Sequence, residues 1–162
     1  METLMQLSEQ LGQTLVKSNK LLATAESCTG GGIASAITDI SGSSAWFDRA
    51  FVTYSNEAKM EMLGVKLSTL QTYGAVSEAT VKEMALGALE HSKANAAVSV
   101  SGIAGPDGGT EDKPVGTVCF AWADDSGWLL VETQCFSGDR ASVRDQAVRY
   151  ALKVLTEHYL AD

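Results

Sequence analysis

The chain has 162 residues, of which 45% are hydrophobic and 20% are charged, and its 12 basic and 20 acidic residues give a net charge of −8. This length and composition predict one soluble globular domain over residues 1–162, with room for a sizeable core. The acidic balance argues against a nucleic-acid partner, because nonspecific binding needs a basic surface that displaces counterions.

The first part of the chain predicts a helix, a strand and a second helix. Leucines recur at helical spacing from Leu4 to Leu15, which favours an amphipathic helix over residues 2–18. Residues 20–25 predict a short buried strand, and the glycines that follow it open a helix that runs to about Ile40.

The middle of the chain predicts a strand and two further helices. The composition of residues 46–55 is typical of a strand. A short helix follows, in which Asn56 is placed to cap the start and Gly64 to end the last turn. Ser77 then starts a longer helix over residues 78–92.

The last part of the chain predicts three strands and a final helix. Residues 95–101 form a small-residue buried strand, and residues 115–124 and 127–136 form a hairpin. Gly138 and Asp139 introduce the last helix. Strands that alternate with helices early and pair as a hairpin late favour an α/β fold, with a mixed sheet that carries helices on both faces.

The stretch "AESCTGGG", residues 25–32, is the first candidate for a functional site. It connects a strand to a helix, and open α/β sheets bind ligands at the carboxyl ends of their strands. Free N–H groups at a helix start can hold a phosphate or an oxyanion. The pattern is neither a P-loop, nor a dinucleotide turn, nor a hydrolase nucleophile elbow. A tight turn with no chemistry accounts for the glycines equally well.

Two further segments offer ligand contacts. The loop "SGIAGPDGG", residues 101–109, also follows a buried strand, so the two glycine-rich loops line one pocket if their strands are neighbours. A surface loop is the alternative. Arg140 at the start of the last helix works against the helix dipole, which suggests an anionic partner. A salt bridge to one of the many acids explains Arg140 equally well.

A serine nucleophile at Ser27 needs a base, and neither His91 nor His158 is well placed to supply one. Lys59 is the better candidate, because a lysine serves as base when burial lowers its pKa. It follows a strand end that also carries Tyr54. Taken alone, a lysine on a short helix is most often a solvated surface residue.

The three cysteines and two histidines form no metal-ligand pattern, so we expect no metal. Cys119 and Cys135 lie in apolar runs and are predicted to be buried thiols. No apolar run is long enough to span a membrane, and the N-terminus lacks the basic start and apolar block of a signal peptide. We therefore expect a cytoplasmic protein with no membrane partner.

Several motifs carry a resemblance that covers residues 5–160: "TAESCTGG", "FVTYSNEAK", "GAVSE", "SVSGIAGPDGG", "KPVGTV" and "CFSGDR". Together they resemble the CinA C-terminal domain family, and within it the stand-alone amidases that act on nicotinamide mononucleotide. The resemblance implies a three-layer α/β/α sandwich with a mixed sheet. It also implies an amidohydrolase that releases ammonia from nicotinamide mononucleotide, in pyridine nucleotide recycling and without a cofactor.

The resemblance implies that Ser27 is the nucleophile and Lys59 its base, with Tyr54 steering the proton or orienting the lysine. Cys28 is the competing nucleophile, since a thiol at a helix start is intrinsically more reactive. The remaining expectations concern substrate binding. The backbone N–H groups of Thr29, Gly30 and Gly31 are expected to hold the oxyanion. The loop with Ser101, Gly102 and Gly105, together with Arg140, is expected to contact the phosphate.

Two other classes of function stay open at this point. A non-catalytic nucleotide-binding module, linked to competence or DNA-damage physiology, would use the same loops and release no ammonia. A structural subunit would form a homo-oligomer through Trp46, Phe47 and Phe51. Two polar strand-end turns argue against that third interpretation.

Overall fold

A computed structural model describes residues 1–161. Its strands are β1 (Leu22–Glu26), β2 (Phe47–Val52), β3 (Ala96–Gly102), β4 (Thr117–Asp124) and β5 (Leu129–Cys135). Its α-helices are α1 (Leu4–Lys17), α2 (Gly32–Thr38), α3 (Asn56–Leu63), α4 (Leu67–Tyr73), α5 (Glu78–Glu90) and α6 (Arg140–Leu160), and Ser43–Ala45 forms a short 3-10 helix.

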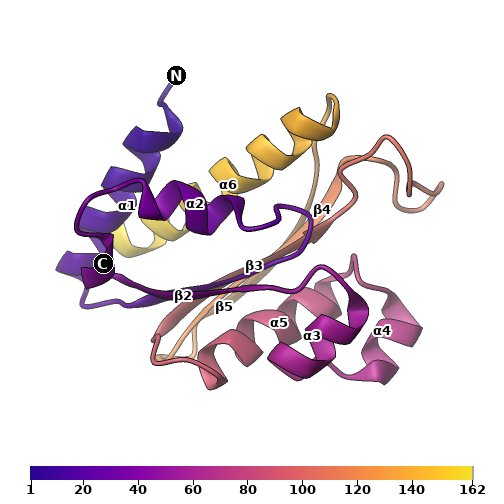
Figure 1. Cartoon of the computed structure of the whole chain (residues 1–162), viewed down its shortest axis with the longest axis horizontal. Helices are drawn as coiled ribbons and strands as arrows, with labels where there is room; N and C mark the ends of the chain where they lie inside the picture. The colour runs from indigo at the N-terminus through magenta and orange to yellow at the C-terminus, as the bar shows by residue number, and fades with distance from the viewer. Residues whose placement is uncertain (162) are drawn as a thin grey trace.

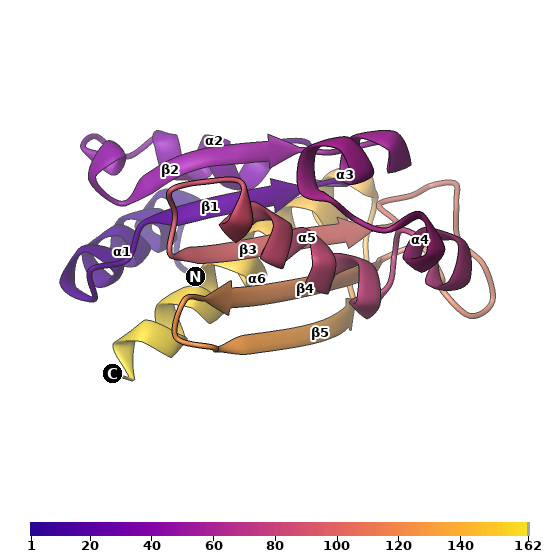
Figure 2. The ribbon, with the colours of Figure 1, turned by 90° about the horizontal axis from the view of Figure 1, so that it is seen from below.

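The strands form one mixed sheet in the order β2-β1-β3-β4-β5 (Figure 2). β1 runs parallel to both of its neighbours, β2 and β3. β4 runs antiparallel to β3, and β5 antiparallel to β4, as the predicted hairpin requires. The neighbouring positions of β1 and β3 bring the two glycine-rich loops to the same edge of the sheet.

Helices cover both faces of this sheet, with α1, α2 and α6 on one face and α3, α4 and α5 on the other (Figure 1). Each face has its own apolar core: leucines of α1 pack with α6 on the first, and Leu63, Val81 and Met84 pack on the second. The α/β/α sandwich with a mixed sheet, expected from the sequence, is confirmed.

The alternation of side chains along β4 explains how the two cores differ. Phe120 and Trp122 point to the face of α6, where the indole N–H of Trp122 donates to the Ala151 carbonyl at 3.1 Å. Ala121 and Ala123 point to the face of α5. Because side chains alternate across a strand, the large residues fill one layer and the small ones let α5 pack close to the other.

Two local predictions for residues 55–73 need correction. Ser55, not Asn56, caps α3, and its hydroxyl accepts from the N–H of Ala58 at 3.0 Å. Both residue types cap helices, and the extended backbone of Ser55 decides between them. α4 was not predicted, because Thr69 and Leu70 are the only buried residues in its seven described positions and leave no apolar stripe.

One prediction of burial is wrong, and the alternative of an oligomer contact through Trp46 loses its support. Cys135 is exposed at the end of β5, although Cys119 is buried as expected. Trp46 is buried in the core, with 3% of its surface exposed, and packs against Gly12 of α1. Phe47 and Phe51 are partly buried against the two cores. Trp46 therefore supplies no surface for an oligomer contact.

The carboxyl ends of β1, β2 and β3 point the same way, because these three strands are parallel. α2 leaves β1 toward one face of the sheet and α3 leaves β2 toward the other (Figure 1). Such a divergence opens a crevice where α/β proteins bind ligands. Among residues 1–161, no helix has the length and hydropathy needed to cross a bilayer.

Candidate active site

Ser27 lies directly after β1 and is anchored by both neighbouring strands. Its N–H donates to the Val100 carbonyl of β3 at 3.1 Å, and the preceding Glu26 carbonyl accepts from the Thr53 N–H after β2 at 2.8 Å. The chain then turns through Gly30 and Gly31, whose φ angles of 58° and 97° are left-handed. Glycine adopts these angles without strain, so the turn can reverse within two residues.

Lys59 reaches Ser27 from the first turn of α3. Its side chain is buried, with 1% of the residue exposed. The Lys59 Nζ lies 3.0 Å from the Ser27 Oγ. It also donates to the backbone carbonyls of Thr53 at 2.8 Å and Tyr54 at 3.2 Å. The carbonyls can only accept, so they hold two amine protons and direct the remaining position of the nitrogen at the serine hydroxyl.

Burial shifts the pKa values of the candidate base, Lys59, and of the competing nucleophile, Cys28, in opposite directions. Desolvation lowers the pKa of the Lys59 amine from its ordinary value of 10.5, which favours the neutral form that can take a proton. Desolvation also raises the pKa of the Cys28 thiol to about 11. A protonated thiol is a poor nucleophile. The geometry and the electrostatics therefore favour Ser27 over Cys28.

These groups open into a pocket of about 290 Å³ at the carboxyl edge of the sheet. Its lining residues come from the ends of all three parallel strands, from α3, from the α4–α5 connection and from the start of α6: Ser27, Cys28, Tyr54, Lys59, Ala75, Val76, Ser101, Gly102, Ala104 and Arg140. The two glycine-rich loops thus share one pocket. Its size is near the lower end for small-molecule sites.

The start of α2 is less open to ligands than the glycine turn suggests. The Glu26 carboxylate is fully buried and accepts from the N–H groups of Ile33 at 2.9 Å and Ala34 at 3.0 Å. The Gly30 N–H donates to the Ser27 carbonyl at 3.0 Å. Within residues 1–161, the N–H groups of Thr29 and Gly31 have no such partner. An oxyanion contact in this turn can therefore use Thr29 or Gly31 but not Gly30.

The other expected site residues lie at different distances from the pair formed by Ser27 and Lys59, called the dyad below. Tyr54 touches Lys59 through its backbone carbonyl, whereas its side chain lines the pocket with 66% of the residue exposed. Ser101 and Gly102 line the pocket directly. Gly105 does not line this pocket but lines the adjoining hollow, and its carbonyl accepts from the Arg140 guanidinium at 2.8 Å.

Arg140 has no acidic partner in the part of the chain that the structure describes. Its guanidinium lines both the dyad pocket and an adjoining hollow of about 330 Å³ that also includes Gly105 and Gly138. The salt-bridge alternative for Arg140 is therefore not realised, and the cation faces the crevice.

Two residues of the site were missed from the sequence. Glu26 has no sequence signature for its place beneath α2, where its carboxylate accepts from the first N–H groups of that helix. Arg144 of α6 donates to the carbonyls of Cys28 at 3.0 Å and Thr29 at 3.2 Å. It follows Arg140 by one helical turn, and that spacing was the only available signal.

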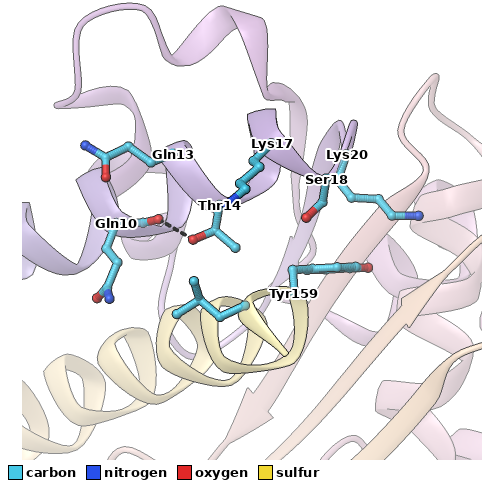
Figure 3. A pocket seen from close by; sticks show the side chains of 8 residues that line it. Gln10, Gln13, Thr14, Lys17, Ser18, Lys20 and Tyr159 are labelled. Atoms are coloured by element: carbon cyan, nitrogen blue, oxygen red, sulfur yellow. Dashed lines mark hydrogen bonds between the residues drawn. The ribbon is translucent and has the colours of Figure 1, made fainter. Parts of the chain in front are cut away.

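A larger hollow of about 520 Å³ lies between α1 and α6 (Figure 3), next to Lys20 before β1 and therefore at the opposite end of that strand from Ser27. The Thr14 hydroxyl there donates to the Gln10 carbonyl at 2.8 Å, and Lys20 pairs with Asp125 at 3.1 Å. These polar groups already serve as partners within the fold, so the smaller pocket is the better candidate. No group of three His, Cys, Asp or Glu residues is arranged to hold a metal within residues 1–161.

A buried hydroxyl–amine pair in a pocket is an arrangement that can activate a serine hydroxyl as a nucleophile. The chain belongs to the CinA C-terminal domain family, whose model matches residues 4–159. It is 60% identical over 157 residues to the nicotinamide-nucleotide amidohydrolase PncC of Escherichia coli (strain K12), covering 97% of this chain and 95% of that protein.

Two further proteins are similar to this chain over nearly its whole length. The nicotinamide-nucleotide amidohydrolase PncC of Pseudomonas putida is 50% identical over 157 residues, which cover 97% of this chain and 98% of that protein. The competence/damage inducible protein CihA from Agrobacterium tumefaciens is 45% identical in sequence. Its crystal structure matches this one with a TM-score of 0.93, and the match covers 97% of this chain and 98% of that one.

Proposed function

We propose that this protein hydrolyses the carboxamide of nicotinamide mononucleotide to nicotinate mononucleotide and ammonia. The observation that carries the proposal is the 3.0 Å contact between the Lys59 amine and the Ser27 hydroxyl inside a pocket. The names of the relatives at 60% and 50% identity supply the substrate. A cytoplasmic location and a role in pyridine nucleotide recycling, both expected from the sequence, belong to the same proposal.

The reaction begins with attack of the Ser27 Oγ on the carboxamide carbon while neutral Lys59 takes the hydroxyl proton. The carbonyl π electrons move to oxygen, and backbone N–H groups of Thr29 and Gly31 stabilise the resulting oxyanion. One such donor is worth about 3–4 kcal/mol of barrier. When the C–N bond breaks, Lys59 returns the proton to the leaving nitrogen, so ammonia departs and an ester to Ser27 remains.

Water completes the turnover. Neutral Lys59 takes a proton from the attacking water, the tetrahedral intermediate forms again, and the ester bond to Ser27 breaks. Lys59 then gives its proton back to the serine oxygen, so the enzyme returns to its starting state and nicotinate mononucleotide leaves. The same base is used in both halves of the reaction.

Substrate binding involves the remaining pocket residues. The 5′-phosphate is held by Arg140, whose charge has no acidic partner within residues 1–161, together with the loop that carries Ser101, Gly102 and Gly105. The exposed Tyr54 ring at the pocket lining can stack on the cationic pyridinium ring. In this arrangement Tyr54 orients the lysine through its carbonyl and the substrate through its ring.

Ammonia release from nicotinamide mononucleotide, in the presence of a chelator and beside nicotinamide and NAD as controls, tests the proposal. We expect release from the mononucleotide, and loss of release with retained binding in Ser27→Ala. A protein that binds the mononucleotide, as shown by a raised melting temperature, but releases no ammonia would be a nucleotide-binding module. An active Ser27→Ala variant would transfer the nucleophile role to Cys28.

A further inference from the structure

Arg144 holds the backbone of the nucleophile turn in a specific orientation. Its Nε donates to the Cys28 carbonyl at 3.0 Å, and its Nη2 donates to the Thr29 carbonyl at 3.2 Å. The guanidinium fork thus contacts two successive peptide units directly after Ser27. A planar fork fixes two acceptors at once, which an ammonium group cannot do.

The two peptide units differ in where their N–H groups go. In a trans peptide the C=O and N–H bonds point in opposite directions, and the only cis bond among residues 1–161 is Gly105–Pro106. In the peptide unit that contains the Thr29 carbonyl, the Gly30 N–H donates to the Ser27 carbonyl. The unit with the Cys28 carbonyl sends its Thr29 N–H away from Arg144, where residues 1–161 offer it no acceptor.

Glu26 holds the same turn from within the fold. Its fully buried carboxylate accepts from the Thr29 hydroxyl at 2.6 Å and from the first N–H groups of α2. A buried carboxylate with these donors is costly to move, because any displacement breaks the hydrogen bonds that compensate for its burial. Thr29 is therefore fixed by its side chain on one side and by its carbonyl on the other.

We propose that Arg144, with Glu26 as its counterpart, is a positioning residue that aims the Thr29 N–H at the oxyanion of the reaction. The inference rests on the proposed function, in which Ser27 is the nucleophile. Arg144 contacts neither Ser27 nor Lys59 by a hydrogen bond and does not itself line the pocket, so it acts through the peptides that it orients. An oriented donor acts mainly on the transition state, so its loss lowers kcat more than it raises KM.

Arg144→Gln and Arg144→Lys test this role, since each keeps a donor but loses the fork. Arg149→Gln is the matched control: Arg149 lies on the same helix, pairs with Asp145 at 2.8 Å and has no contact with the turn. We expect kcat for ammonia release to fall by about 10- to 100-fold in Arg144→Gln, as for a misplaced catalytic group. KM should stay within about threefold, and the control should behave as wild type.

Labelling of Ser27 by a fluorophosphonate gives a second measurement that does not depend on the natural substrate. The variant should react more slowly by a similar factor yet still reach one label per chain, which shows that the fold is intact. An unchanged kcat and labelling rate would overturn the inference. So would a loss of kcat that merely matches a lower final label count, because that result reports unfolded protein.

The same experiment separates the two proposals. If the wild type is labelled at Ser27 but releases no ammonia from nicotinamide mononucleotide, the substrate assignment fails and the labelling rates still decide the role of Arg144. If the wild type is neither labelled nor active, both proposals fail, because the turn then carries no nucleophile to serve.

Discussion

Replacement of Lys59 by methionine separates catalysis from stability more sharply than any other change in the site. Methionine has a similar length and is apolar, so it fills the buried space while removing the amine that lies 3.0 Å from the Ser27 Oγ. Loss of a positioned base costs about 10²–10⁴ in rate. Because Ser27 and Lys59 act as a unit in the proposed mechanism, we expect kcat to fall by about 10³-fold or more, or roughly 4 kcal/mol of barrier.

Stability should change far less. The variant leaves the carbonyls of Thr53 and Tyr54 without this donor, at about 1 kcal/mol each. It also removes an amine whose burial disfavours the charged form. These effects oppose each other, so the free energy of unfolding should change by less than about 2 kcal/mol, or less than about 8 °C in Tm for a chain of this size.

The pH dependence gives an independent check. Because burial lowers the pKa of Lys59 below 10.5, the unfolded chain binds more protons between that lowered value and 10.5. The contribution of Lys59 to the free energy of unfolding is therefore fully present above pH 10.5, and it is lost as pH falls from there through the folded pKa. Activity should rise with pH through the same lowered pKa, because only the neutral amine takes the serine proton.

The assay follows ammonia release across pH beside thermal unfolding, with Lys66→Met as a control at an exposed lysine of the α4 cap. A folded Lys59→Met variant that keeps more than about a tenth of wild-type kcat would refute the base assignment, since a base contributes at least about 10²-fold. An intact kcat with a raised KM would make Lys59 a binding residue instead.

Three further substitutions test neighbouring groups. Cys28→Ala should keep kcat within about threefold at neutral pH, because burial raises the pKa of that thiol to about 11; a 100-fold loss would make Cys28 the nucleophile. Glu26→Gln should lower the free energy of unfolding by about 2–3 kcal/mol in urea titrations, since one accepting oxygen cannot satisfy donors at both carboxylate atoms; an unchanged midpoint would contradict this. Tyr54→Phe should preserve kcat and KM, whereas Tyr54→Ala should raise KM by about 2- to 30-fold; a kcat loss in the phenylalanine variant would give the hydroxyl a part in proton transfer.

Periodicity predicted most of the fold because its apolar residues follow the buried faces. The leucines of α1 and the small residues of β3 identify a helix and a strand without tertiary information. α4 escaped prediction because it packs with only two buried residues, so no periodic signal marks it. The exposure of Cys135 depends on β5 being the sheet edge, which follows from strand order and not from the composition of the strand.

Some residues of the candidate site could likewise be predicted from the sequence, and others could not. Ser27 and Lys59 could be paired from the sequence, because both follow predicted strands and a serine nucleophile needs a base. Glu26 and Arg144 could not, because their partners depend on where α2 and α6 cross the sheet. Arg144 is 116 positions from Cys28, and no local pattern records that contact.

The sheet topology explains why a single serine can receive help from two sides. β1 lies between β2 and β3, so its carboxyl end is open to both faces of the sandwich. The face of α3 supplies Lys59, the proposed base, whose amine lies 3.0 Å from the Ser27 hydroxyl, and the face of α6 supplies Arg144, which holds the following peptides. Base and backbone donor thus come from separate layers, so a change in α6 can alter the oxyanion contact while the dyad stays in place. Because of this separation, we expect Arg144 and Lys59 variants to differ in the labelling of Ser27. An Arg144 variant should be labelled more slowly, whereas a Lys59 variant loses the base that drives the attack.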